Sequence, residues 1–246
     1  MDNLILSNIS NGVLTITLNN LEKKNSLTTA IYNSLTQLFS EANSNDDIRC
    51  LLLQGNNECF SAGNDLADFL ACPDGEEPAA YNFVRALADF TKPIVVAVAG
   101  PAIGIGSTLL LHSDIVIATD NAKFGMPFSK LGLCPEAGSS LLLTQLVGHA
   151  KAFELMVLGD IFDADTALSL NLINKKVAKD ELLPTALAYA ERIASLPADA
   201  VMSSRLLMKQ ANANLLEDAL QHEFPTFARL MQTDDCRAIL NKFLTK

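Results

Sequence analysis

The chain has 246 residues, of which 49% are hydrophobic, and its formal net charge is −10. This length accommodates one large domain or one domain with an appendage, and the apolar content predicts a folded chain rather than a disordered one. The acidic balance argues against nucleic acid and anionic membranes as partners. A few local lysines could still bind a small anionic ligand.

Five cysteines stand at positions 50, 59, 72, 134 and 236, and no two of them form a Cys-x-x-Cys pair. Their odd number and spacing predict neither a disulfide framework nor a zinc ribbon, which is typical of a reducing cytoplasm. The first residues lack the basic and apolar segments of a signal peptide, so a cytoplasmic protein is expected. Residues 93–111 carry no charge, but prolines and glycines interrupt them, which favours a buried strand, a tight turn and a helix over a membrane span.

In chain order, the first half predicts alternating strands and helices. Strands are expected at 13–18, 48–53, 94–99 and 115–118, and helices at 27–43, 79–91 and 107–112. The second half predicts helices at 139–158, with a break near Gly148, and at 163–170, then a last strand at 173–177. From residue 181 only helical patterning remains, broken at Pro197 and Pro225. This order predicts an α/β protein.

We expect a core over residues 1–190 and a helical region over residues 191–246. The helical region is rich in apolar side chains: Leu206, Leu207, Leu216, Leu220 and Phe224. These positions are expected to be buried, either against a neighbouring subunit or against the core of the same chain.

Two turns rich in small residues, at 59–66 and 100–106, each follow a predicted strand and precede a helix. Small residues let the backbone approach a ligand closely, and two such turns can direct two N–H groups at one oxygen, as in an oxyanion hole. Gly104, Ile105 and Gly106 resemble the start of a dinucleotide fingerprint, but Leu109 stands where its third glycine belongs. Tight packing of strand on helix is the alternative explanation.

A carboxylate is the best candidate for a catalytic base. Glu136 has apolar neighbours in the segment 131–138, and burial there would raise its pKa into the range that suits proton transfer. The alternative is a solvated acid at the N-terminus of the following helix. Other nucleophilic or metal-assisted chemistry lacks support, because there is no Gly-x-Ser-x-Gly elbow and the three histidines have no metal-ligand spacing.

Two further polar features of the sequence have simple interpretations. Asp65 is expected to cap a helix that begins near Leu66. Lys23 and Lys24 form a basic spot that could hold a phosphate or be merely solvated. The segment 67–80 is predicted to be a loop that shapes the substrate site.

Several of these segments resemble, in register, the crotonase (enoyl-CoA hydratase/isomerase) superfamily. The matching pieces are Lys-Lys-Asn-Ser-Leu at 23–27, Phe-Ser-Ala-Gly-Asn-Asp-Leu at 60–66, the strand and turn at 92–104, and Pro-Glu-Ala-Gly at 135–138. The resemblance implies a spiral of ββα units whose helical C-terminal region, 191–246, mediates assembly into a homotrimer or a dimer of trimers. It also implies an acyl-CoA thioester as the ligand, with no separate cofactor and no metal.

The same resemblance makes the backbone N–H groups of Ala62 and Ile105 the oxyanion-hole donors. The substrate-binding positions that it implies are Lys23, Lys24, Ser61, Gly63, Asn64, Asp65, Leu66, Gly104 and Phe128. Hydratases of the family use two glutamates to handle water, and their positions correspond here to Thr108 and Phe128. Neither residue can act as a general acid or base, so hydratase activity is not expected.

Glu136 instead resembles the glutamate of the peroxisomal-type Δ3,Δ2-enoyl-CoA isomerases. That branch implies double-bond migration from a 3-enoyl-CoA to a 2-trans-enoyl-CoA, with Glu136 carrying the proton. The alternatives are a hydratase with relocated acids, another member that processes acyl-CoA, and a binder of acyl-CoA without catalytic activity.

Overall fold

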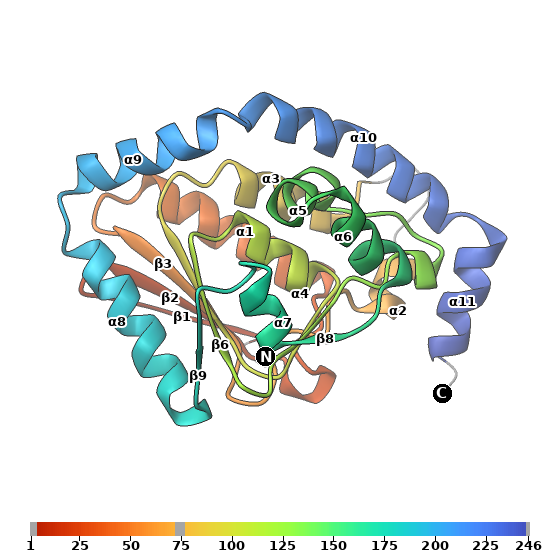
Figure 1. Ribbon diagram of the computed structural model, residues 1–246, viewed down its shortest axis with the longest axis horizontal. Helices are drawn as coiled ribbons and strands as arrows, with labels where there is room; N and C mark the ends of the chain where they lie inside the picture. The colour runs from red at the N-terminus through yellow and green to blue at the C-terminus, as the bar shows by residue number, and fades with distance from the viewer. Residues whose placement is uncertain (1–3, 72–76, 245–246) are drawn as a thin grey trace.

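The computed structural model describes residues 4–71 and 77–244, and its elements confirm the predicted α/β class (Figure 1). The larger sheet has the strand order β1-β2-β3-β4-β6-β9. Its strands are β1 (Ile5–Ser10), β2 (Val13–Leu18), β3 (Cys50–Gln54), β4 (Ile94–Val98), β6 (Ile115–Thr119) and β9 (Lys175–Val177). β1 is antiparallel to β2, and all later neighbours run parallel. Helices supply the crossovers that parallel strands require.

A smaller sheet joins three short strands in the order β5-β7-β8. These strands are β5 (Pro101–Ile103), β7 (Lys123–Gly125) and β8 (Phe162–Asp163). They were not predicted, because runs of two or three residues are too short to show a periodicity. The sheet is nonetheless important, since β5 holds the second small-residue turn.

Both faces of the larger sheet are covered. Along β3, Leu51 and Leu53 belong to one apolar cluster and Leu52 to another, because successive strand residues point to opposite faces. The first cluster includes side chains of α1 (Thr29–Ser44) and α3 (Ala79–Ala88). The second includes α8 (Leu182–Ala194), which contacts β3, β4 and β6. Burial on both faces explains why these strands read as continuous apolar runs.

The remaining helices follow the predicted ranges closely. They are α2 (Leu66–Leu70), α4 (Ile105–Thr108), α5 (Ser139–Val147), α6 (His149–Phe153) and α7 (Ala164–Ser169). α4 continues into a 3₁₀ turn over Leu109–His112. Of the predicted loop 67–80, α2 occupies the first residues, and residues 72–76 lie outside the described part. The predicted boundary at residue 190 falls inside α8.

Three helices, α9 (Ala198–Gln210), α10 (Ala213–Met231) and α11 (Asp234–Leu244), complete the chain and arch along one side of the molecule (Figure 1). The break at Pro197 is confirmed, but the break at Pro225 is wrong: Pro225 lies inside α10. Proline removes one backbone hydrogen bond, yet Phe224 and Phe227 beside it are buried. Their burial holds the helix together, since tertiary packing supplies most helical stability.

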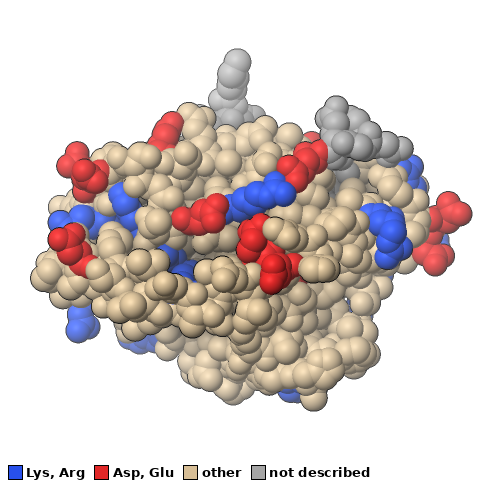
Figure 2. Space-filling view, turned by 90° about the horizontal axis from the view of Figure 1, so that it is seen from above, with Lys and Arg blue, Asp and Glu red and all other residues tan. Residues whose placement is uncertain are grey.

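The predicted burial of the apolar positions in this region holds for some of them and not for others within this chain. Leu216, Leu220 and Phe224 pack against the core of the same chain. By contrast, Leu206 is 64% exposed and Leu207 is 72% exposed. Figure 2 views the molecule from the side of α9 and α10. Among the described residues of this face, the basic side chains lie singly or beside acidic ones. Within the described part, no helix is both long and apolar enough to cross a membrane.

Candidate active site

The two small-residue turns lie side by side. The Ser61 N–H donates to the Pro101 carbonyl at 2.9 Å, and the Ile103 N–H donates to the Ser61 carbonyl at 3.0 Å. Gly63 has a φ of +91°, and a Cβ there would lie 2.6 Å from the Ile103 carbonyl oxygen. Only glycine allows this approach, so the sequence at position 63 fixes how closely the turns pack.

Ile105 is the first residue of α4, and Gly104 before it has φ +57° and ψ −122°. Residues other than glycine rarely adopt this backbone conformation. The first N–H groups of a helix have no acceptor within the helix, so the Ile105 N–H is free of the helical ladder. Ile105 as a whole residue is 1% exposed, and its side chain belongs to the main apolar cluster.

The Ala62 N–H is in a different situation. It donates to the Lys24 carbonyl at 3.0 Å. Lys24 and Asn25 both have left-handed backbone angles, with φ of +51° and +53°, which aim this carbonyl at the first turn. A substrate oxygen at Ala62 would therefore have to share the N–H with Lys24 or displace its carbonyl.

Glu136 lies in the loop that precedes α5, and its carboxyl contacts Thr108 at the end of α4. The Thr108 hydroxyl donates to its Oε1 at 2.5 Å, and both side chains are buried. Burial raises the pKa of Glu136 to about 8; the Thr108 hydrogen bond acts against this rise and the charge of Glu223 adds to it. The alternative of a solvated acid is therefore wrong, because Glu136 is only 7% exposed. A carboxylic acid with such a pKa can both accept and return a proton near neutral pH.

Lys23 and Asp65 form an ion pair, with 2.8 Å between Nζ and Oδ2. The other oxygen of Asp65 accepts the Asp68 N–H at 3.1 Å at the start of α2, so the predicted helix cap is confirmed. Lys24 is exposed. Lys23 would have to leave Asp65 to bind a phosphate, whereas Lys24 is directly accessible.

Apolar side chains occupy the position of the second hydratase acid. Phe128 is 4% exposed and lies in a cluster with Leu133 and Leu155, against which Leu66 packs. An apolar wall of this kind excludes water and strengthens electrostatic interactions nearby.

Tyr32 is a polar residue of this region that the sequence did not suggest. It projects from α1, is buried, and donates its hydroxyl to the Asn64 side-chain oxygen. Burial raises its pKa well above the usual value, and the charge of Glu136 contributes, so the two groups are close in space. Its only sequence signal is an apolar helix position, which predicts burial alone. Among the described residues, no cluster of three or more His, Cys, Asp or Glu side chains is suited to a metal ion.

The signature of the family described as "Enoyl-CoA hydratase/isomerase" matches residues 8–246. The chain belongs to the enoyl-CoA hydratase/isomerase family. The solved structure of Pseudomonas aeruginosa OdaA superimposes with a TM-score of 0.96 at 37% identity and covers 100% of both chains. The expected crotonase fold is thereby confirmed.

Relatives within the family carry different activities in their names. The chain is 37% identical to the 1,2-epoxyphenylacetyl-CoA isomerase of Escherichia coli K12, covering 100% of this chain and 97% of that protein. It is 33% identical to the probable enoyl-CoA hydratase echA8 of Mycobacterium leprae, covering 94% and 91%. It is 31% identical to the rat enoyl-CoA delta isomerase 2, covering 98% of this chain and 63% of that protein. Membership in the family is thus shown, and the particular reaction must be argued from the site.

Proposed function

We propose that this chain is a Δ3,Δ2-enoyl-CoA isomerase, which converts a 3-enoyl-CoA into the 2-trans-enoyl-CoA. One observation carries the proposal: Glu136 is buried and accepts a hydrogen bond from the Thr108 hydroxyl, and this burial raises its pKa to about 8. The two positions that hold water-handling acids in hydratases carry Thr108 and Phe128 instead, and both are buried. Moving a double bond requires one group that takes and returns a proton, whereas hydration requires a second group to activate water.

The proposed reaction begins with the thioester oxygen between the Ala62 and Ile105 N–H groups. The ionised Glu136 removes a proton from C2, and the electron pair moves through the double bond to form a dienolate. Negative charge collects on the thioester oxygen, where the two N–H donors stabilise it. Protonated Glu136 then delivers the same proton to C4, which leaves the double bond between C2 and C3.

The two N–H donors of the proposed oxyanion hole contribute unequally to stabilising the transition state. An oxyanion-hole donor is worth about 2.7–4 kcal/mol in the transition state. The Ile105 N–H is expected to contribute stabilisation in that range. The Ala62 N–H is expected to contribute less, because it must give up its hydrogen bond to the Lys24 carbonyl before it can bind the substrate oxygen. A positioned general base adds about 10²–10⁴-fold in rate.

The test is Glu136→Gln, which keeps the size of the side chain and removes the base. The rate of 3-enoyl-CoA isomerisation should fall by about 10²–10⁴-fold, while a saturated acyl-CoA still binds. Glu217→Gln, an exposed change on α10, is the matched control. An unchanged rate in Glu136→Gln contradicts the assignment.

Product analysis separates the other activities. A hydratase would release 3-hydroxyacyl-CoA from 2-enoyl-CoA, and an acyl-CoA binder would convert neither substrate. Because of the similarity to the Escherichia coli protein, 1,2-epoxyphenylacetyl-CoA belongs in the same substrate panel. Turnover of that compound with no turnover of 3-enoyl-CoA would replace the proposed substrate class.

We also propose assembly into a homotrimer or a dimer of trimers. Its support is the apolar surface of α9, where Leu206, Leu207 and Met208 are 64%, 72% and 78% exposed. Large apolar side chains that are neighbours on a surface are typical of an interface between subunits.

A further inference from the structure

The loop that carries Glu136 has an unfavourable backbone. Ala137 has a φ of +56° and Gly138 a φ of +71°. Glycine adopts such angles freely, but alanine does so only when surrounding contacts enforce them. The position of Glu136 therefore depends on groups outside the loop.

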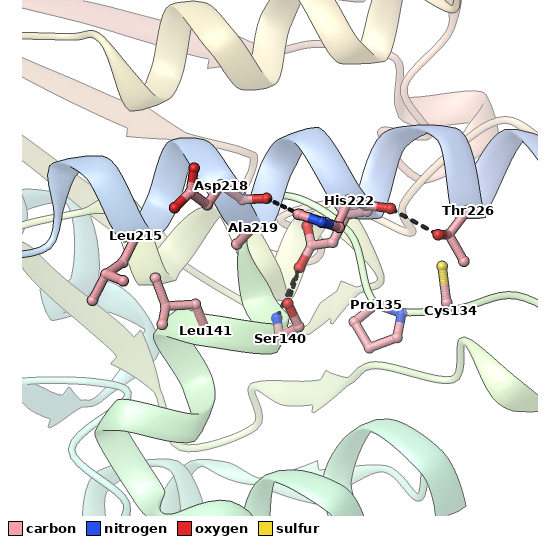
Figure 3. A pocket seen from close by; sticks show the side chains of 10 residues that line it. Cys134, Pro135, Ser140, Leu141, Leu215, Asp218, Ala219, His222 and Thr226 are labelled. Carbon is pink, nitrogen blue, oxygen red and sulfur yellow. Dashed lines mark hydrogen bonds between the residues drawn. The ribbon is translucent and has the colours of Figure 1, made fainter.

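The first of these groups is Glu223, on α10. Its Oε2 accepts the Gly138 N–H at 2.6 Å. Its Oε1 accepts the Ser140 N–H at 3.0 Å and the Ser140 hydroxyl at 2.5 Å. Figure 3 shows this contact region, with Pro135 of the loop and Ser140 of α5 facing Ala219 and His222 of α10. The three groups that bond to the Glu223 carboxyl all donate to it, which favours its anionic form. Burial acts in the opposite direction and raises the pKa of Glu223.

The second group is His112, at the end of the helical stretch that begins with Ile105. Its Nε2 lies 2.7 Å from the Ala137 carbonyl oxygen. Since a carbonyl only accepts, Nε2 must carry the proton and donate it. Burial lowers the pKa of His112 to about 4, so the ring is neutral at pH 7. The loop is thus held by its carbonyl at Ala137 and by its N–H at Gly138.

We propose that Glu223 is a positioning residue for the base: it binds the N–H groups of Gly138 and Ser140, two and four residues after Glu136, and thereby fixes where the Glu136 carboxyl meets the substrate. This inference rests on the proposed function. A plain helix cap would also bond the first N–H groups of α5. The difference is that the bonded N–H of Gly138 lies two residues from the base, within the strained part of the loop.

The negative charge of Glu223 also affects the pKa of Glu136. Tyr32 of α1, Cys134 of its own loop and Glu223 lie close enough to Glu136 for their charges to interact, and His112 bonds to the Ala137 carbonyl beside it. Burial raises the pKa of Tyr32 well above its usual value and that of Cys134 to about 11, so both are neutral at pH 7, like His112. The Lys209 ammonium group donates a hydrogen bond to the His112 carbonyl oxygen at the edge of this group of residues. Glu223 is therefore the charged neighbour of Glu136, and it disfavours ionisation of the base.

The experiment is Glu223→Gln, with Glu217→Gln on the same helix as the control. An amide has one accepting oxygen, so it cannot serve both Gly138 and Ser140. With 3-enoyl-CoA as substrate, kcat should fall by about 10–100-fold while KM changes by less than about threefold, since displacing a base by about 1 Å costs up to about 10²-fold. Ser140→Ala removes only the hydroxyl donor and should lower kcat several-fold.

A substrate-free readout distinguishes failure of this inference from failure of the proposed reaction. Infrared spectroscopy of protein with ¹³C-labelled glutamate can follow the Glu136 carboxyl, identified as the band missing from Glu136→Gln. In Glu223→Gln its titration midpoint should fall, because the neighbouring negative charge is gone. A wild-type kcat in folded Glu223→Gln or in Ser140→Ala, or an unchanged midpoint, overturns the inference. Wild-type protein that does not isomerise 3-enoyl-CoA overturns the proposed function instead.

Discussion

Replacing Thr108 with valine removes a hydroxyl that donates a hydrogen bond to Glu136 and stabilises its ionised form. Valine has nearly the same shape as threonine, so the packing of α4 is kept. The Thr108 hydroxyl lies 2.5 Å from Glu136 Oε1, and burial keeps water from replacing it. The variant should therefore titrate differently while binding the same substrates.

The size of the effect follows from the strength of the bond. A hydrogen bond to a charged, buried group is worth about 1.5–3 kcal/mol. At 1.36 kcal/mol for each pH unit, its loss moves the midpoint of Glu136 upward by about one to two pH units. With a wild-type pKa of about 8, roughly a tenth of the base is ionised at pH 7. In Thr108→Val that fraction falls about 10–100-fold, partly offset by the greater strength of a more basic carboxylate.

The assay is the pH dependence of kcat/KM for 3-enoyl-CoA, which reports the ionisation of the free enzyme. Wild-type kcat/KM should rise about tenfold per pH unit up to about pH 8 and then level off. Thr108→Val should be slow at pH 7 and recover much of its rate by pH 9.5. The control is Thr144→Val, since that exposed hydroxyl bonds to the Ser140 carbonyl. A variant that is slow by the same factor at every pH would refute the role of Thr108 in setting the pKa.

Two further predictions concern stability and assembly. Because the pKa of Glu136 is raised on folding, from 4.5 to about 8, its ionisation costs the folded state stability as pH rises through this window. Glu136→Gln should therefore unfold at the wild-type temperature near pH 4.5 but at a higher one at pH 9, where the difference is at most about 5 kcal/mol; equal melting temperatures at pH 9 would contradict this. Leu207→Asp should reduce the mass measured by light scattering, whereas a monomeric wild-type protein would rule out the proposed interface.

Much of the fold could be predicted because long elements leave a periodic signal. β4 is buried along its whole length and appears in the sequence as an unbroken apolar run. The strand β1, by contrast, was missed because it lies at the edge of the sheet and all but its first residue are exposed. The predicted break at Pro225 failed for a related reason. Local propensity was outweighed by burial of the neighbouring aromatic side chains, which a single residue does not reveal.

At the site, the sequence could predict the burial of Glu136, the proposed base, but not its partners. The apolar neighbours of Glu136 are adjacent in the chain, so its burial was predictable. Thr108 lies 28 residues away and Glu223 lies 87 residues away, and such contacts depend on the complete fold. The Lys24 carbonyl at the Ala62 N–H is equally invisible, since a backbone contact leaves no trace in the residue type.

The proposed chemistry of this site depends on the balance between the protonated and the ionised form of the Glu136 carboxyl. Burial and the charge of Glu223 favour the protonated form of Glu136, and the Thr108 hydroxyl favours the ionised form. A base that remained fully ionised would bind its proton too weakly to deliver it, and one with a much higher pKa would be protonated before substrate arrived. In the proposed reaction, the Thr108 hydroxyl therefore has a role of its own: it keeps the pKa of Glu136 within reach of neutral pH, which supports the return of the proton to the substrate.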